Sequence, residues 1–65
     1  MRIDKKKFIL KCAEKVMNPI DVAKSAGLSV ETIYKITSGG GNITAKTLGK
    51  VSKALQTNPQ DLIAE

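Results

Sequence analysis

The chain has 65 residues, of which 42% are hydrophobic and 26% charged, a balance typical of a folded domain and not of a disordered tail. No apolar run approaches the ~20 residues that a membrane span needs, and no signal peptide is visible at the start. With no histidine and Cys12 as the single cysteine, the residues exclude a zinc module and an intrachain disulfide, which fits a reducing cytoplasm. We therefore expect one small cytoplasmic domain spanning residues 1–65, with a compact aliphatic core.

The charge distribution favours a polyanionic partner. Eleven basic residues against six acidic ones give a formal net charge of +5. Residues 1–53 hold all eleven basic side chains and four of the acidic ones, whereas residues 54–65 hold two acidic side chains and no basic one. A basic body with a mildly acidic end indicates nucleic acid first and an anionic membrane surface second. Charge alone does not decide, because many small domains are basic merely for solubility.

The first predicted helix begins after Asp4, a suitable N-cap, and runs through Val16. Its apolar residues fall at i, i+1, i+4, i+5 and i+8, which we interpret as one stripe facing the core. The members of this stripe are Phe8, Ile9, Cys12, Ala13 and Val16. For Cys12, we expect a small buried apolar role.

The second helix is expected from Asn18-Pro19 to about Ala26, because Asn caps and Pro at the first helical position sacrifices no hydrogen bond. Gly27 suits the left-handed residue that closes such a helix. Ser29 is expected to cap a third helix over residues 30–37.

Further along, residues 38–42 (SGGGN) form a polar, permissive loop. Thr44 is expected to cap a fourth helix that buries one apolar side. Its apolar residues are Leu48, Val51, Ala54 and Leu55. A second Asn-Pro pair at Asn58 predicts a short fifth helix that buries Leu62 and Ile63. The expected fold is therefore all-α, with five short helices and no strand.

The junction between the second and third helices is abrupt. Inward positions are Val22, Ala23 and Ala26 on one helix and Ile33, Ile36 and Thr37 on the other. A small residue at Ala23 and a glycine in the turn permit a close crossing, which is the geometry of a helix-turn-helix unit. The opposite arc of the third helix carries Glu31, Tyr34, Lys35 and Ser38, flanked by Val30 and Thr32.

The stretch VAKSAGLSVETIYKI (residues 22–36) resembles the helix-turn-helix of the phage lambda repressor and Cro superfamily, also called the xenobiotic-response-element family. The matching positions are Ala23, Gly27, Leu28, Ile33 and Ile36. The stretch GNITAKTLGKVSKALQTNPQDLI resembles the fourth and fifth helices of that family, so the resemblance covers roughly residues 8–63.

This resemblance implies a lambda repressor-like domain that binds double-stranded DNA. The implied base contacts are Val30, Glu31, Thr32 and Lys35. The implied backbone contacts are Asn18, Ser29, Tyr34, Asn42, Thr44 and Lys46. Helix starts suit phosphates because free N–H groups and the positive end of the helix dipole point outward there.

Two departures from the family pattern concern phosphate binding. Pro19 stands where many relatives carry a polar side chain, often Gln, that binds phosphate and braces the third helix. The SGGGN loop carries no charge, whereas this loop is often basic in relatives. Lys46 is the nearest replacement. For Lys5, Lys6, Lys7, Lys50 and Lys53, plain solvated charge is the more economical interpretation.

The expected function is sequence-specific transcriptional regulation, most simply as a repressor of phage or mobile-element origin, bound to DNA as a homodimer. The resemblance implies that the dimer forms through residues 59–65, where relatives often dimerise. The alternative is a protein-interaction module such as the antitoxin of a toxin–antitoxin pair. Glu31 either accepts a hydrogen bond from a cytosine amine or merely favours the helix start electrostatically. No enzyme, cofactor, metal, membrane or small-molecule ligand is indicated by these residues.

Overall fold

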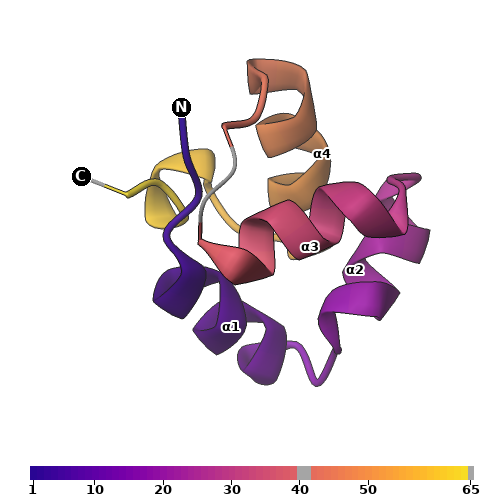
Figure 1. The fold of residues 1–65 in the computed structure, drawn as a ribbon. Coiled ribbons are helices and arrows are strands. Elements are labelled where there is room, and N and C mark those ends of the chain that lie inside the picture. Colours follow the sequence, from indigo (N-terminus) through magenta and orange to yellow (C-terminus); the bar gives the residue numbers. More distant parts are fainter. Residues whose placement is uncertain (40–41, 65) are drawn as a thin grey trace.

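The computed structural model describes residues 1–39 and 42–64, in which short helices pack against one another (Figure 1). Its elements are α1 (Lys5–Glu14), α2 (Pro19–Ala26), α3 (Val30–Ser38), α4 (Ala45–Ala54) and the 3-10 helix η1 (Pro59–Asp61). None of the described helices has the length and apolar character required to cross a membrane. The all-helical class is confirmed, but the fifth predicted helix is a single 3-10 turn. Gly40 and Gly41, inside the predicted loop 38–42, lie outside the described residues.

Three helices begin at the predicted N-cap side chains. Asp4 Oδ1 accepts from the Lys7 N–H at 3.0 Å, Ser29 Oγ from Thr32 at 3.3 Å, and Thr44 Oγ1 from Thr47 at 3.2 Å. Each bond satisfies one of the N–H groups that a helix start leaves without an intrahelical partner. These caps explain why helices of only 9 to 10 residues begin at defined places.

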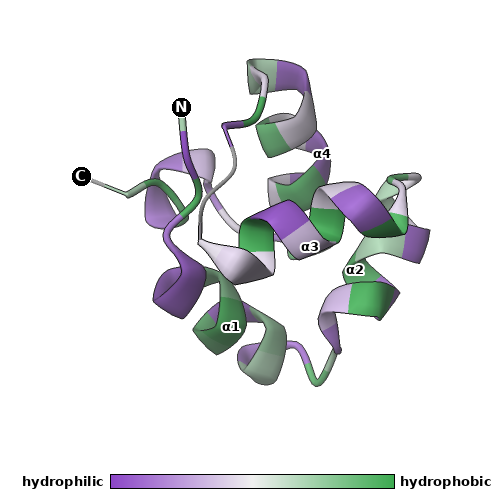
Figure 2. Ribbon diagram, in the orientation of Figure 1, coloured by the Kyte–Doolittle hydropathy of each residue, from purple (hydrophilic) through white to green (hydrophobic). Residues whose placement is uncertain are grey.

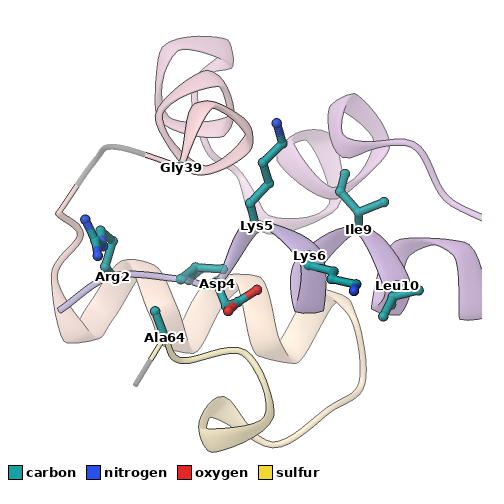
Figure 3. A pocket seen from close by; sticks show the side chains of 9 residues that line it. Arg2, Asp4, Lys5, Lys6, Ile9, Leu10, Gly39 and Ala64 are labelled. Atoms are coloured by element: carbon teal, nitrogen blue, oxygen red, sulfur yellow. The ribbon is translucent and has the colours of Figure 1, made fainter.

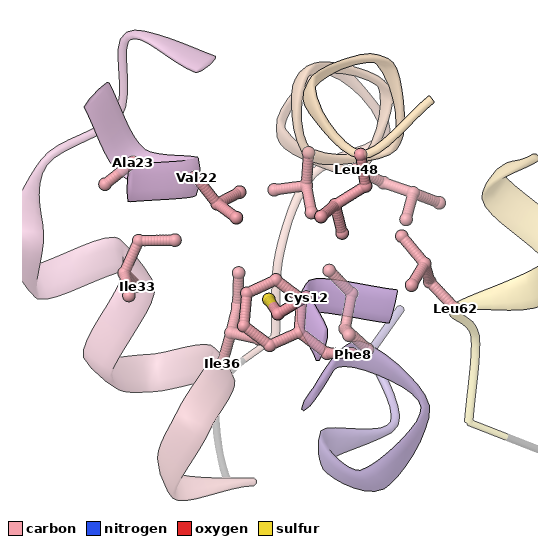
Figure 4. Close-up of a cluster of buried hydrophobic side chains, with 11 residues drawn as sticks. Phe8, Cys12, Val22, Ala23, Ile33, Ile36, Leu48 and Leu62 are labelled. Atoms are coloured by element: carbon pink, nitrogen blue, oxygen red, sulfur yellow. The ribbon is translucent and has the colours of Figure 1, made fainter. Parts of the chain in front are cut away.

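The core is aliphatic and draws on every helix except η1, which is followed directly by buried Leu62 (Figure 4). Its buried members are Ile3, Phe8, Cys12, Val22, Ala23, Ile33, Ile36, Leu48, Val51, Leu55 and Leu62. Phe8 is completely buried and supplies the aromatic ring of this core. Burial also raises the pKa of the Cys12 thiol above its ordinary value of 9.0, which keeps it a neutral apolar group, as predicted.

The predicted apolar stripe of α1 is wrong in three of its five members. Phe8 and Cys12 are buried, but Ile9, Ala13 and Val16 are exposed, and Val16 is 91% exposed. The helix also ends at Glu14, before Val16. The error arises because residues at i and i+1 are about 100° apart on a helix. The core covers α1 on one side only, so one of the two apolar rows must face solvent.

The two chain ends pair with each other, which no sequence pattern had predicted. Ile3 and Ile63 form an isolated antiparallel bridge, and the Asp4 N–H donates to Leu62 O at 2.7 Å. Leu62 is buried as predicted, whereas Ile63 is half-buried. Because the carbonyl of Leu62 serves this pairing, the chain turns back after η1 instead of continuing as a helix.

Val16 adopts a left-handed conformation with φ 55°. For an L residue this region costs about 1–2 kcal/mol, and a β-branched side chain is especially unfavourable there. We predict that Val16→Gly raises the free energy of unfolding by about 1 kcal/mol, after the added flexibility of the unfolded chain is subtracted. Urea unfolding at low protein concentration measures the change. Gln56→Gly, at φ 53° but unbranched, is the matched control with a smaller gain. A lower free energy of unfolding in Val16→Gly would contradict the claim that the left-handed conformation of Val16 destabilises the fold.

Candidate DNA-binding surface

The junction of α2 and α3 has the geometry that the sequence predicts. Gly27 has φ 70°, in the left-handed region that glycine adopts readily. The Leu28 N–H donates to Ala23 O at 2.9 Å, which satisfies a carbonyl at the end of α2. Leu28 and Ser29 alone separate Gly27 from the first residue of α3. The chain therefore changes direction within one short turn.

The inner sides of the two helices are held by close packing. Val22 is 0% and Ala23 2% exposed, and both lie beside buried Ile33 of α3 (Figure 4). Ala26, Thr37 and Leu28 are half-buried at the edge of this contact. Since Ala23 carries a single methyl group, α3 can approach α2 closely. The position of α3 thus depends on the size of one side chain.

The opposite side of α3 is exposed and mixed in chemistry. Figure 2 shows polar and apolar residues alternating along the helix. Val30 is 43% and Tyr34 60% exposed, and Glu31 and Lys35 also face solvent. In the described part of the chain, the one ion pair joins Lys11 to Glu14 at 3.4 Å. The charges of Glu31 and Lys35 are therefore not paired within these residues and remain open to a ligand.

Thr32 differs from its neighbours on α3. It is half-buried, and its Oγ1 lies 3.0 Å from Ser29 Oγ, which also accepts from the Thr32 N–H. These contacts tie the first turn of α3 to its cap. The two hydroxyls are engaged with each other, so they are less free than Glu31 or Lys35 to reach a base or a phosphate.

The starts of α2 and α4 differ in electrostatics. At α4, Thr44 and Lys46 are exposed, and the first turn holds no acidic residue. At α2, the Asp21 carboxylate accepts from the Asn18 N–H at 2.9 Å and places a negative charge at the helix start. Sequence reasoning missed Asp21, although an acidic residue three positions after the N-cap is a known capping pattern. An anion is therefore better accommodated at α4 than at α2.

The remaining predicted contacts lie on the surface but away from these starts. Asn42 is exposed and precedes α4 by two residues. Tyr34 projects from the middle of α3 with its backbone carbonyl accepting from Thr37 Oγ1 at 3.3 Å. Ser38, which is on the same arc of α3 but is not a predicted contact, donates to Lys35 O at 3.0 Å. The base-contact residues lie within the first six residues of α3, whereas the predicted backbone contacts are spread over the starts of three helices and the middle of α3.

Residues 10–64 match the protein family described as Cro/C1-type HTH DNA-binding domain. The match spans most of the chain, so the protein belongs to this helix-turn-helix family. The lambda repressor and Cro resemblance predicted from residues 22–36 is thereby confirmed. No curated protein matches the chain.

Two solved structures have a similar fold. They are described as native PhpD with cadmium atoms, at a TM-score of 0.83, and PhpD with cadmium complexed with hydroethylphosphonate, at 0.82. Each is 22% identical over 100% of this chain, and this chain spans 14% of the length of the PhpD chains. At this level of identity the likeness shows the fold alone.

A larger side chain at Ala23 should displace α3. We predict that Ala23→Leu lowers the free energy of unfolding by about 1–3 kcal/mol, the usual cost of overpacking a close contact. Thermal and urea unfolding measure this loss. Ala26→Leu is the matched control, since half-buried Ala26 has room at the edge of the contact. Equal losses in the two variants would contradict a special role for the Ala23 crossing.

Proposed function

We propose that this protein is a sequence-specific regulator of transcription, most simply a repressor, that places α3 in the major groove of double-stranded DNA. The observation that carries the proposal is the set of exposed side chains at the start of α3, on a rigidly held helix-turn-helix of the Cro/C1-type family. Residues 1–65 would act as one DNA-binding domain, in the compartment that holds the DNA. No catalytic role is assigned to any residue.

Three side chains of α3 suit base recognition. Lys35 can donate to guanine O6 and N7, Glu31 can accept from a cytosine amine, and Val30 can contact a thymine methyl group. All three are exposed within the first six residues of the helix. Thr32 is given a lesser role because its hydroxyl is engaged with Ser29. Glu31 should contribute to the selection of bases more than to DNA affinity. Its carboxylate is repelled by the DNA phosphates unless a hydrogen-bond donor on a base pairs with it.

Phosphate contacts are proposed chiefly at the start of α4. Thr44 and Lys46 combine free N–H groups, a helix dipole and an exposed cation at this end. Tyr34, Asn42 and Ser29 are further candidates along the DNA backbone. Asn18 is the weakest, because the Asp21 carboxylate already occupies its N–H group.

Binding as a homodimer is part of this proposal. One short recognition helix reads one half-site, and two-fold dimers of such domains read near-palindromic sites. A repressor would act by occupying such a site and blocking access to the promoter. A phage or mobile-element origin remains the simplest context for a small domain of this family.

A protein-interaction module, such as an antitoxin, is the second candidate function. The exposed apolar residues of α1 favour a protein contact at that helix. A second copy of the same chain could make this contact as well as a different protein could. A protein contact at α1 also leaves the exposed side of α3 without a role. DNA binding therefore explains more of the surface.

The decisive experiment is selection of binding sites from a randomised pool of duplex DNA, followed by sequencing. A two-fold symmetric consensus is the expected result. Salt-sensitive binding without a consensus would reduce Val30, Glu31 and Lys35 to backbone contacts. Absence of binding would overturn the proposal and favour a protein partner.

The role of Glu31 can be tested separately. We predict that Glu31→Ala relaxes the base preference in the selection while affinity for random duplex DNA stays equal or rises. Glu14→Ala, which removes an exposed glutamate on α1, should leave the consensus unchanged. Weaker binding of Glu31→Ala to random DNA, with an unchanged consensus, would show that the carboxylate acts only on helix stability.

The phosphate contact of Lys46 should appear in the salt dependence of binding. We predict that Lys46→Ala weakens binding to all sequences alike and reduces the slope of log K against log salt by about 0.9. Fluorescence anisotropy on a half-site and on random duplex DNA measures both effects. Lys53→Ala, at the other end of α4, is the matched control with an unchanged slope. Identical slopes in wild type and Lys46→Ala would exclude this contact.

A further inference from the structure

The solvent side of α1 carries a continuous apolar row, which we call the outer face of α1. Its members are Ile9, Leu10, Ala13 and Val16. Ile9 is 40%, Leu10 59% and Val16 91% exposed, so half of the six large exposed apolar side chains are on this row. Figure 2 shows that α1 is hydrophilic in its first turn and mostly hydrophobic beyond it. An apolar row of this kind on a small domain indicates an interaction surface.

The conformation of Val16 adds to this indication. An exposed valine is held at φ 55°, where glycine or asparagine is the usual residue, and it buries almost nothing in the core. Strain of this kind is found at functional positions, where another contact compensates for it. Within the chain this conformation closes α1, because the Val16 N–H donates to Ala13 O at 3.1 Å and the Met17 N–H to Cys12 O at 2.9 Å. The exposed valine side chain takes no part in this closure.

The N-terminal end of the outer face is a cation-rimmed groove. A hollow of about 570 Å³ lies between α1, the end of α3 and the chain ends. Ile9 and Leu10 line it, with Arg2, Lys5 and Lys6 around them (Figure 3). The carboxylate of Asp4, also at this groove, is engaged as the N-cap of α1. An apolar group accompanied by negative charge would fit here.

The other end of the outer face has the complementary character. Val16 projects into solvent and lines a hollow together with Asp21, whose exposed side chain carries a negative charge. One helix face thus carries an apolar groove with positive charge at one end and an apolar projection with negative charge at the other.

We propose that the outer face of α1 is the surface at which two copies of this chain meet, with their α1 helices antiparallel about a two-fold axis. This arrangement brings Val16 of each copy to the groove of the other, and it sets the larger Ile9 opposite the smaller Ala13. It rests on the homodimer of the proposed function and names the surface that forms it.

A second copy fits better than other occupants of this face. An acidic helix of another protein would match the groove but meet repulsion from Asp21 at the other end. The expected dimer surface at residues 59–65 offers less, because Leu62 is buried, Ile63 is half-buried, and Pro59, Gln60 and Asp61 are not backed by exposed apolar residues. The outer face of α1 is the larger apolar surface of the two.

The size of the outer face predicts a weak dimer. A stable interface buries about 800 Å² on each partner, and one two-to-three-turn helix face supplies less. We therefore expect association in the range of about 10 µM to 1 mM, which DNA with two half-sites would reinforce. The start of α3 lies beside α2, at the far end of α3 from the groove, and stays uncovered (Figure 1).

The test is sedimentation equilibrium of the full chain without DNA, from about 10 µM to 1 mM, with two matched variants. Ala13→Glu places a charge in the centre of the outer face, and Gln56→Glu adds the same charge at an exposed residue just after α4, away from the proposed DNA contacts. We expect the wild type and Gln56→Glu to approach the dimer mass as concentration rises. Ala13→Glu should associate at least about tenfold more weakly, because the two-fold axis introduces the charge twice.

Binding to a single DNA half-site serves as the fold control, since it needs no dimer and should be equal in all three proteins. A monomeric wild type up to about 1 mM would overturn the proposal, as would equal loss of association in both variants. Loss of half-site binding in the wild type would instead overturn the proposed function. The two failures are therefore distinguishable.

Discussion

The close crossing of α2 and α3 is the constraint on which the rest of the structure depends. It exists because Gly27 takes a left-handed conformation at φ 70° and Ala23 is small enough to be buried against α3. A longer connection or a larger side chain would let α3 move relative to the core. Since Ile33 and Ile36 are buried on one side of α3, the position of that side determines what the other side presents. Val30, Glu31 and Lys35 are exposed as a consequence of this packing.

Short helices need defined starts, and the chemistry of these starts also affects function. Ser29 and Thr44 use neutral hydroxyls as caps, whereas α2 has the Asp21 carboxylate hydrogen-bonded to the Asn18 N–H. Both kinds of cap stabilise a helix. The two kinds of cap differ in how well the helix start can bind an anion, because a carboxylate there competes with a phosphate for the same N–H groups. The start of α4, with Lys46 and no acidic residue, is therefore the more suitable place for a phosphate.

The two sides of α1 show that a small core cannot bury every apolar side chain of a helix. Phe8 and Cys12 use the side that faces α2, α3 and the chain ends, and the core has no second layer to cover Ile9, Leu10 or Ala13. In a domain of this size the ratio of surface to volume prevents burial of every apolar side chain. What distinguishes α1 is that its exposed apolar residues lie close together and end in a valine at φ 55°.

By itself the sequence determined the four α-helices, their caps at Asp4, Ser29 and Thr44, the Gly27 turn, and the exposed residues of α3. These are local properties, because a cap or a left-handed glycine involves residues within one turn of each other. Only the tertiary structure decided which apolar row of α1 is buried, because periodicity at i and i+1 fits both rows until the neighbours of the helix are known. It also decided that the chain after Pro59 forms a single 3-10 turn. About sixty residues away in the sequence, the Asp4 N–H donates to the Leu62 carbonyl and Ile3 pairs with Ile63. Contacts between the two ends of a chain leave no periodic trace in either end, so they follow from the assembled core alone.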